Sequence, residues 1–323
     1  MSDMHLVTKD FLKHKFDLEA IKKGFGKGLL AAGKQNEQVV AACADLTGST
    51  AMNLFAEDFP ERFVEVGIAE QNLVTVGSGL AAMGKIPFVS SYAAFSPGRN
   101  WEQIRTTICL NDQTVHVVGS HAGLYTGADG ATHQMLEDIA LTRVLPNMTV
   151  IAPADSIEAE KAVLALSEYK SPSYLRLTRE PTPIFTTKET PFEIGKAYVY
   201  KDGKDVTLIA TGTMTINTLM AADILANHGI DAEVIHLPTI KPLDEGTILN
   251  SVKKTNRVVT VEEAQIQAGM GSAICELLAE EMPTKVLRIG VKDKFGQTGQ
   301  PADLLEHYGL TPNHIALKVH QVL

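Results

Sequence analysis

The stretch Arg62–Asn72 reads R-F-V-E-V-G-I-A-E-Q-N and indicates a strand, a turn and the start of a helix. The apolar run at 63–66 suits a buried strand, and Gly67 ends it. Ile68–Gly84 then continues as a helix rich in small residues. Glu70 therefore lies just past a strand end, in the first turn of a helix. In open α/β sheets this is where ligands bind.

The surroundings of Glu70 make it a candidate functional residue. An acid at a helix N-terminus by itself contributes only a few tenths to about 1 kcal/mol of stability. The helix that follows includes V-T-V-G-S-G-L-A-A-M-G at 74–84, without a charged residue. We expect such a helix to be buried on all sides or packed against another subunit. A carboxylate at its start would be partly desolvated, which favours a functional role.

Length and composition limit the classes of protein that fit. With 323 residues, 45% of them hydrophobic, the chain can form two domains that each bury a core. The net charge of -9 argues against a general nucleic-acid surface but allows a small anion held by a few arginines. The N-terminus lacks the apolar core of a signal peptide, and the sequence has no apolar run of membrane-spanning length. We therefore expect a cytoplasmic protein without nucleic-acid or membrane partners.

The three cysteines do not form a recognisable pattern. Cys43, Cys109 and Cys275 lie far apart and none belongs to a C-x-x-C pair. Neither a disulfide framework nor a structural zinc site is indicated, and buried filler in the core is the expected role.

Strands alternate with helices through most of the chain, which predicts an α/β fold built on parallel sheets. Residues 1–17 are expected to form an N-terminal arm and residues 18–180 the first domain. The expected strands there lie at 39–43, 63–66, 86–89, 114–118, 149–152 and 173–177, and the helices begin at 18, 68, 101, 133 and 155. The last of these helices should be capped by Asp155, with Glu158 three residues later.

Three prolines interrupt this periodicity between residues 181 and 193, so this segment is predicted to be an interdomain linker. Residues 194–323 are expected to form a second, smaller α/β domain. A K-D-G-K turn at 201–204, between apolar runs at 197–200 and 206–210, predicts a β-hairpin. The remaining strands are expected at 232–237, 258–261 and 285–289, with helices at 214–228, 244–254, 270–281 and 314–322.

Polar and aromatic residues follow the expected strands of the first domain. If these strands are parallel, the following side chains share the carboxyl edge of one sheet: Asp45, Thr47, Ser49, Glu70, Tyr92, Phe95, His121 and Arg179. Tyr92 and Phe95 could be core filler, but small residues around them favour a surface on which a flat ring stacks.

A glycine-rich segment at 119–134 reads G-S-H-A-G-L-Y-T-G-A-D-G-A-T-H-Q. His121, Asp129 and His133 within it suggest polar groups around a hydroxylated substrate. Metal binding by these residues ranks lower because their spacing matches no zinc pattern, and we assign no metal ligand in this chain. The sequence also contains neither G-x-x-x-x-G-K-[ST] nor a G-x-G-x-x-G that opens a helix after a strand, so no diphosphate-binding loop is evident.

Three motifs together resemble the transketolase family of thiamine diphosphate enzymes: V-G-I-A-E-Q-N at 66–72, Y-A-A-F-S-P-G-R at 92–99, and H-x(7)-D-G-x-T-H-Q at 121–134. The resemblance spans the pyrimidine-binding domain and the C-terminal domain of that family. It implies that Glu70 bonds the pyrimidine N1′ and favours the imino tautomer, which prepares the cofactor to lose its C2 proton. Phe95, and with it Tyr92, would stack on the pyrimidine ring.

The resemblance also implies substrate contacts. His121 and Asp129 match residues that contact sugar hydroxyls, and His133 matches another active-site histidine. Arg179, in L-T-R-E-P, matches the arginine that grips the sugar phosphate with its forked donors, and Ser49 matches a further phosphate contact.

The sequence departs from the family pattern at several positions. Gln71 follows the glutamate where full-length members have histidine, and Pro97 and Gly98 occupy the later part of the aromatic loop. Another phosphate-binding arginine of the family falls near Lys22 or Lys23. The G-D-G motif with which the family holds Mg²⁺ and diphosphate is missing from this chain.

The resemblance therefore implies the C-terminal subunit of a split transketolase. Such a subunit would transfer a two-carbon ketol unit between ketose and aldose phosphates, as in the pentose phosphate pathway. An N-terminal partner subunit would hold Mg²⁺ and the diphosphate of thiamine diphosphate. We expect a homodimer of this chain within a heterotetramer. The alternatives are the β subunit of a 2-oxo-acid dehydrogenase, a 1-deoxyxylulose-5-phosphate synthase-like enzyme and a non-catalytic assembly subunit, but the D-G-x-T-H-Q motif favours sugar chemistry.

Overall fold

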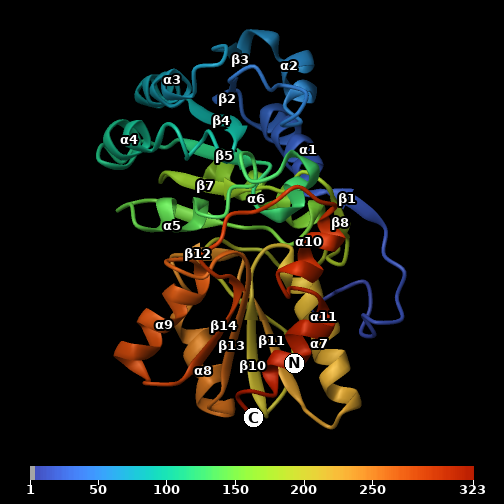
Figure 1. Cartoon of the computed structure of the whole chain (residues 1–323). Coiled ribbons are helices and arrows are strands. Elements are labelled where there is room, and N and C mark those ends of the chain that lie inside the picture. Colours follow the sequence, from blue (N-terminus) through green and yellow to red (C-terminus); the bar gives the residue numbers. More distant parts are fainter. Residues whose placement is uncertain (1–3) are drawn as a thin grey trace.

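The computed structural model describes residues 4–323 and arranges them in two α/β domains, one above the other (Figure 1). The upper domain contains a seven-stranded sheet made of β2 (Val39–Cys43), β3 (Phe63–Glu65), β4 (Ile86–Tyr92), β5 (His116–Ser120), β6 (Thr149–Ile151), β7 (Ser173–Arg176) and β12 (Thr239–Lys241). The order across this sheet is β12-β6-β7-β5-β4-β2-β3. All neighbouring pairs are parallel except β12 with β6. The predicted α/β fold class is confirmed.

The central strands of this sheet are buried because helices cover both of its faces. Every residue of β2, β5, β6 and β7 is buried. The strand β3 was predicted to be buried but is only partly covered, and Glu65 within it is exposed. The reason is its position, since β3 is the edge strand and has one neighbour only.

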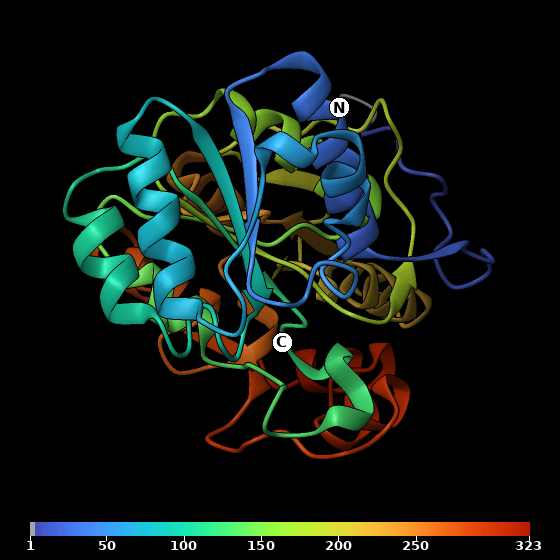
Figure 2. The same cartoon turned by 90° about the horizontal axis from the view of Figure 1, so that it is seen from above.

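Two groups of helices cover the upper sheet (Figures 1 and 2). One face packs against α1 (Ile21–Gln35), α2 (Asn53–Asp58) and α6 (Ser156–Glu168), and the other against α3 (Glu70–Ala82), α4 (Trp101–Gln103), the π-helical segment η2 (Ile104–Cys109) and α5 (Asp138–Arg143). The helices α1 and α6 approach closely, because a Cβ on Gly24 would lie 1.8 Å from the carbonyl oxygen of Ser156. The predicted cap of α6 is present, since Asp155 accepts a hydrogen bond from the Glu158 amide at 3.0 Å.

Several helices of this domain are shorter than predicted, including α3, and in two of them the first residues of the predicted helix form other structure. The helix expected from residue 18 begins at Ile21, because residues 18–20 form the short strand β1 (Leu18–Ala20). The helix expected from residue 133 begins only at Asp138. The segment before it pairs instead with the loop after β5, where the Gly123 amide donates to the Met135 carbonyl at 2.8 Å.

The proline-rich segment contains a short strand, β8 (Pro181–Pro183), which pairs antiparallel with β1. Proline is compatible with this two-stranded sheet because each strand has a free edge that needs no amide donor.

The lower domain contains a five-stranded sheet in the order β14-β13-β10-β11-β9. Its strands are β9 (Tyr198–Lys201), β10 (Val206–Ala210), β11 (Ala232–His236), β13 (Val258–Gln265) and β14 (Val286–Val291). Its helices are α7 (Met214–Asn227), α8 (Glu245–Thr255), α9 (Met270–Glu281), α10 (Pro301–His307) and α11 (Pro312–Val319).

The predicted hairpin of β9 and β10 is wrong. The strand β11 lies between them and pairs antiparallel with β9 and parallel with β10. The intervening turn passes close over the start of β11, because a Cβ on Gly203 would lie 2.3 Å from the Glu233 amide nitrogen. This glycine therefore serves a close backbone crossing and not a tight hairpin.

The two domains exchange segments. The strand β12 lies beyond β11 in sequence, yet it completes the upper sheet. The N-terminal arm runs down beside the lower domain (Figure 1), where the Phe11 amide donates to Asp223 Oδ2 at 2.8 Å. The buried Phe11 side chain joins the core formed around α7 and α11.

No helix within residues 4–323 combines the length and apolar content that a membrane span requires.

Candidate functional site

Four predicted site residues form a cluster of rings at the carboxyl edge of the upper sheet. Tyr92 ends β4, and His121 follows β5 directly. These two rings stack with centroids 3.8 Å apart. Phe95 lies 6.1 Å from Tyr92, and His133 meets the Phe95 ring edge-on at 5.5 Å. Three segments of the chain thus build one aromatic surface.

Glu70 is buried beside this surface. Its side chain is 2% exposed, and Glu70 is the first residue of α3. The Arg99 guanidinium donates to Glu70 Oε2 at 2.7 Å and lies over the Phe95 ring, 4.9 Å from its centroid. Nδ2 of the Asn100 side chain donates to the Glu70 backbone carbonyl at 2.8 Å. Arg99 and Asn100 therefore fix Glu70 relative to the rings.

Arg99 was not predicted as a site residue. It ends the aromatic motif at 92–99, four residues after Phe95. A cation placed one helical turn beyond an aromatic ring, in a loop after a strand, was the signal available in the sequence.

His121 is held as a neutral imidazole. Its backbone has the positive φ of 57° that non-glycine residues rarely adopt, and its Nδ1 lies 2.9 Å from Ser120 Oγ. Burial lowers the pKa of His121, the charges of Lys22, Arg179 and His133 act in the same direction, and together they bring it to about 3. A neutral ring can both donate and accept a hydrogen bond, as recognition of a hydroxyl group requires.

Arg179 lies at the side of this cluster. Its Nη1 donates to the Thr126 carbonyl at 3.0 Å and to Asp129 Oδ1 at 3.1 Å, and its Nε lies 3.4 Å from Glu180 Oε1. Nη2 has no hydrogen bond within residues 4–323 and remains open to a ligand. Asp129 is therefore paired with Arg179.

Lys22 is a second cation near Arg179. Its Nζ donates to the Ser49 backbone carbonyl at 3.0 Å. Burial lowers the pKa of Lys22, and the nearby charge of Arg179 acts in the same direction. Of the two lysines considered for an anion contact, Lys22 is half-buried beside Ser49 and Lys23 is exposed. Lys22, Ser49, His121 and Arg179 thus share one region.

Glu65, which was not predicted as a site residue, shapes the neighbouring loop. Its carboxylate accepts hydrogen bonds from the Asp45 amide at 2.7 Å, from Thr47 Oγ1 at 3.0 Å and from the Gly67 amide at 3.0 Å. It therefore ties the turn after β2 to the turn before α3.

The groups that could bind a metal are dispersed. Within residues 4–323, no group of three or more His, Cys, Asp or Glu side chains is arranged to hold a metal ion.

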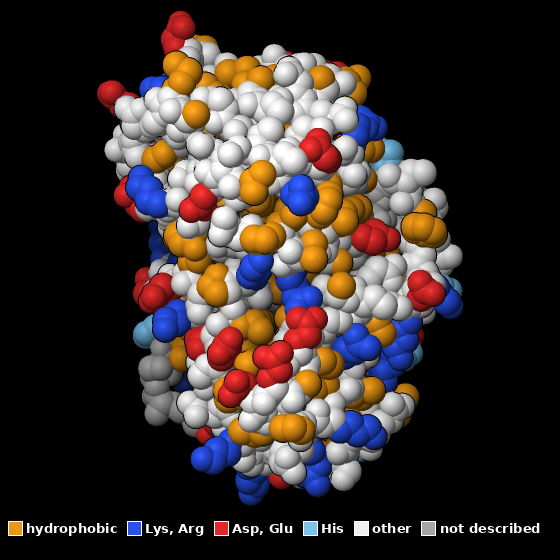
Figure 3. All heavy atoms as spheres, turned by 90° about the vertical axis from the view of Figure 1, so that its left-hand side faces the viewer, with side chains coloured by type: hydrophobic (Ala, Val, Ile, Leu, Met, Phe, Trp, Pro, Cys, Tyr) orange, Lys and Arg blue, Asp and Glu red, His pale blue; other side chains and the backbone are white. Residues whose placement is uncertain are grey.

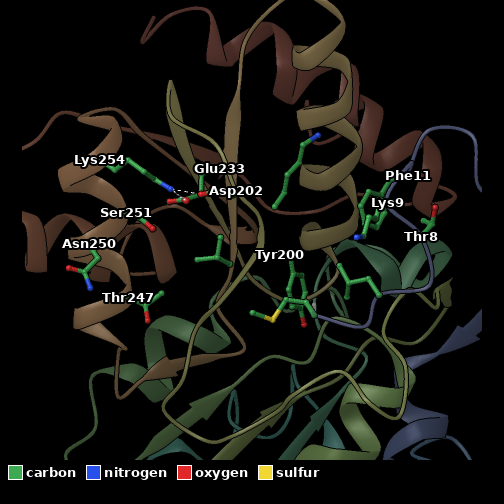
Figure 4. A pocket seen from close by; sticks show the side chains of 14 residues that line it. Thr8, Lys9, Phe11, Tyr200, Asp202, Glu233, Thr247, Asn250, Ser251 and Lys254 are labelled. Carbon is green, nitrogen blue, oxygen red and sulfur yellow. Dashed lines mark hydrogen bonds and ion pairs between the residues drawn. The ribbon is translucent and has the colours of Figure 1, made fainter. Parts of the chain in front are cut away.

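A groove of about 790 Å³ lies away from this edge, between the N-terminal arm and the lower domain (Figure 4). Tyr200 lies at its centre, with Phe11 and Lys9 on one side and residues of α8 on the other. Lys254 forms ion pairs there with Asp202 and Glu233, so the ammonium group of this lysine of α8 is already engaged by two carboxylates. None of the predicted site residues lines this groove.

The helix α3 is not buried on all sides. Leu73, Val74 and Gly77 face the core, whereas Gln71, Thr75 and Gly79 are exposed. Large apolar side chains are exposed on the loops and helix ends of this domain, namely Ile68 (76%), Met83 (80%), Leu110 (74%) and Val144 (67%). Figure 3 shows few charged side chains over the upper domain on this side. Of the two expectations for α3, burial within the chain is therefore wrong, and a subunit contact stays a prediction.

Comparisons with known proteins match both halves of the chain. The model of the transketolase pyrimidine-binding domain matches residues 19–183, and that of the transketolase C-terminal domain matches residues 195–315. A putative transketolase C-terminal section of Methanocaldococcus jannaschii is 44% identical over 304 residues, or 93% of this chain and 95% of that protein.

Two further relatives cover similar lengths. A 6-deoxy-6-sulfo-D-fructose transketolase subunit of a Clostridium species (strain MSTE9) is 39% identical over 91% of each chain. A solved structure described as a split gene transketolase, inactive beta4 tetramer, has a TM-score of 0.88 and 43% identity, and covers 94% of this chain and 98% of that one. The similarity thus includes both domains and the predicted site between residues 49 and 179.

Proposed function

The chain belongs to the transketolase family, and from this premise we propose that it is the C-terminal subunit of a two-chain transketolase. With an N-terminal partner it transfers a two-carbon ketol unit from a ketose to an aldose, both carrying an anionic tail. The observation that carries this proposal is the buried Glu70 carboxylate at the start of α3, next to the ring surface of Tyr92 and Phe95.

The residues present fit the pyrimidine half of thiamine diphosphate, the cofactor of this family. Only Oε2 of Glu70 is bonded to Arg99, and Oε1 has no hydrogen bond within residues 4–323. Oε1 can therefore meet a protonated ring nitrogen, while Tyr92 and Phe95 offer faces for the ring. When bound, the cofactor supplies the electron sink for breaking a carbon–carbon bond.

Glu70, in this proposal, holds a proton at the pyrimidine nitrogen, and its burial keeps water from competing for that proton. Neutral His121, together with His133, orients the sugar hydroxyls and moves a proton at the reacting oxygen. Lys22 and Arg179 bind the anionic tail, with Ser49 beside them. Asp129 acts through its ion pair with Arg179 and can also meet a hydroxyl group once substrate enters.

The comparisons support a partner subunit, since one relative is named a putative transketolase C-terminal section and one similar solved structure is described as a split gene transketolase. The sequence has no G-D-G motif, and residues 4–323 hold no metal-binding cluster. We therefore propose that an N-terminal transketolase subunit holds Mg²⁺ and the diphosphate. The uncovered, nearly uncharged face of α3 supports a contact with a second copy of this chain, which gives a heterotetramer. The division at 1–17, 18–180, 181–193 and 194–323 also stays a proposal.

The anionic tail has two candidates. Phosphate is the usual substituent of transketolase sugars, whereas one relative is a 6-deoxy-6-sulfo-D-fructose transketolase subunit. Both groups present tetrahedral oxygens that a lysine and a forked guanidinium can bind. The assay below therefore includes a donor of each kind.

The test is ketol transfer from xylulose 5-phosphate to ribose 5-phosphate, with thiamine diphosphate and Mg²⁺, using this chain alone, the partner alone and their mixture. A parallel reaction uses 6-deoxy-6-sulfofructose as donor. We expect turnover only in the mixture. Glu70→Gln should nearly abolish it, whereas Glu102→Gln, an exposed acid on α4, should not.

Other outcomes decide against the proposal. If the mixture binds the cofactor but decarboxylates a 2-oxo acid and transfers no ketol unit, the chain is a dehydrogenase β subunit. Wild-type activity in Glu70→Gln would remove the proposed role of Glu70. If this chain without the partner were as active as the mixture, the active site would not be divided between two chains.

A further inference from the structure

Glu263 of the lower domain reaches into the histidine-bearing segment of the upper domain. It lies near the end of β13 and is 3% exposed. The Tyr125 amide donates to Glu263 Oε1 at 2.8 Å, and Thr213 Oγ1 donates to Oε2 at 2.9 Å. Arg176 donates to the Glu263 backbone carbonyl at 2.9 Å. The carboxylate thus has partners from both domains.

The contact with the segment is tight. Gly123 has a φ of +74°, and a Cβ added there would lie 2.4 Å from Glu263 Oε1. The space between the carboxylate and the turn at 123–126 is therefore sized for glycine. A residue with a side chain could not occupy this position without moving Glu263 or the turn.

The turn that Glu263 holds is hydrogen-bonded to two site residues, Arg179 and His121. The Thr126 carbonyl accepts the hydrogen bond from Arg179 Nη1 at 3.0 Å, and Thr126 Oγ1 donates to the His121 carbonyl at 2.6 Å. Tyr125 and Thr126 are adjacent, so a shift of the Tyr125 amide moves the acceptor of Arg179. Glu263 therefore bonds Tyr125, and the next residue, Thr126, bonds Arg179.

The lower domain supports the other end of the same segment. Gln134 Nε2 donates to the Gly127 carbonyl at 2.8 Å and to the Gln297 carbonyl at 3.0 Å. The helix α10 lies against the segment η3 (Leu124–Asp129), and these elements are seen side by side in red and green in Figure 2. The segment is therefore held at both ends by the second domain.

We propose that Glu263 is a positioning residue through which the second domain sets the geometry of the anion-binding residues Lys22 and Arg179. It touches neither substrate nor cofactor and acts through the turn at 123–126 on Arg179 and His121. This inference rests on the proposed function. A buried carboxylate is costly, and here the charge is offset by Arg176 and by two hydrogen-bond donors. A contact that served packing alone would not need such a charge.

The experiment compares Glu263→Gln with Glu262→Gln in the full chain. Glu262 is the preceding residue and equally buried, but its carboxylate accepts from the Met270 and Gly271 amides at the start of α9 and does not contact the turn. Hydrogen exchange of residues 121–134 is followed by mass spectrometry as inorganic phosphate is added. In the wild type and in Glu262→Gln, phosphate should slow exchange of this segment. Glu263→Gln should need about tenfold more phosphate, which corresponds to about 1.4 kcal/mol.

The assembled enzyme gives a second measurement. Glu263→Gln should raise KM for the phosphorylated donor about tenfold with kcat within about twofold, because the variant changes binding of the tail and not the reacting centre. Gly123→Ala should act in the same direction, whereas Gly246→Ala in α8, whose Cβ would meet only Asp244 Oδ1 at 3.9 Å, should not.

Each result has a definite meaning. Equal phosphate protection in Glu263→Gln and wild type overturns the inference, as does a fall in kcat with unchanged KM. No ketol transfer by the wild-type mixture would overturn the proposed function, while the exchange measurement still decides whether Glu263 positions the turn.

Discussion

Replacing Arg176 with methionine tests the ion network that joins the two domains. Arg176 is 5% exposed, and its Nε donates to Asp138 Oδ2 at 2.9 Å. Its Nη1 also lies 3.9 Å from Glu263 Oε2. Methionine keeps much of the side-chain volume but removes the charge and every donor. Asp138, which is fully buried, and Glu263 would then have lost their cation.

The size of the effect follows from this burial. Removing one partner of a buried ion pair costs about 3–5 kcal/mol, because the remaining charge is left without compensation. Asp138 keeps the hydrogen bond from the Tyr174 hydroxyl at 2.8 Å, which places the estimate at the lower end. For comparison, Lys34 forms an exposed pair with Asp58, and its replacement should cost at most about 1 kcal/mol.

Urea unfolding measures the difference. Trp101 is the single tryptophan of the sequence, so its fluorescence reports on the upper domain, and circular dichroism reports on the whole chain. With a slope of about 2–3 kcal/mol/M, Arg176→Met should lower the midpoint by about 1–2 M. Lys34→Met should leave it nearly unchanged. Adding Asp138→Asn to Arg176→Met should recover part of the loss, because it removes one unpaired charge.

Unfolding of Arg176→Met at the wild-type midpoint by both probes would contradict a stabilising ion network around Arg176. A double variant less stable than Arg176→Met would contradict it as well, since removing the charge of Asp138 would then bring no relief. If Arg176→Met alone cannot be purified, the double variant and Asp138→Asn provide the same comparison.

Three further outcomes are expected. His121 should show no NMR titration of its ring protons between pH 5 and 8, because its pKa is lowered to about 3; a midpoint near 6.5 would contradict its burial. Burial raises the pKa of Glu262 from 4.5 to about 7. The unfolded chain therefore loses this proton at lower pH than the folded chain, and the stability of the fold decreases as pH rises from about 4.5 to 7. The urea midpoint of Glu262→Gln should not show this pH-dependent decrease. Arg179→Ala should raise KM for phosphorylated sugars more than for free sugars in the transfer assay, and an equal effect on both would count against phosphate binding.

Elements with local signals were predicted well from the sequence. The strand β2 has the predicted bounds, and so has α9. The cap of α6 depends on residues three positions apart, and Asp155 makes the expected hydrogen bond. In each case the deciding contacts lie within the element itself or directly beside it in the sequence.

The predictions were wrong where contacts with a segment far away in the sequence determine the local structure. The turn at Gly203 has a hairpin composition, but a close crossing over β11 sends β10 to the far side of that strand. The strand β12 is only three residues long and forms because β6 offers it an edge. No periodicity in three residues can indicate such a partner.

The candidate site shows the same difference between features with a local sequence signal and features that depend on distant contacts. Parallel strands bring their following residues to one edge, so the grouping of Tyr92 with His121 followed from the order of elements. Glu263 lies 138 positions from its partner Tyr125, and nothing in either residue's neighbourhood indicates their contact. Glu65 and Arg99 likewise gain their importance from folded geometry.

The pairing of β12 with β6 has a consequence for synthesis on the ribosome. The upper sheet cannot be completed when its own helices and strands have emerged, because its last strand belongs to a later part of the chain. At about 5–20 residues per second, the edge of β6 waits on the order of several seconds for β12. During this interval the nascent chain presents an unpaired apolar edge, which is a target for chaperones and for neighbouring copies. The order in which the chain is made therefore sets a period of vulnerability that the finished molecule no longer displays.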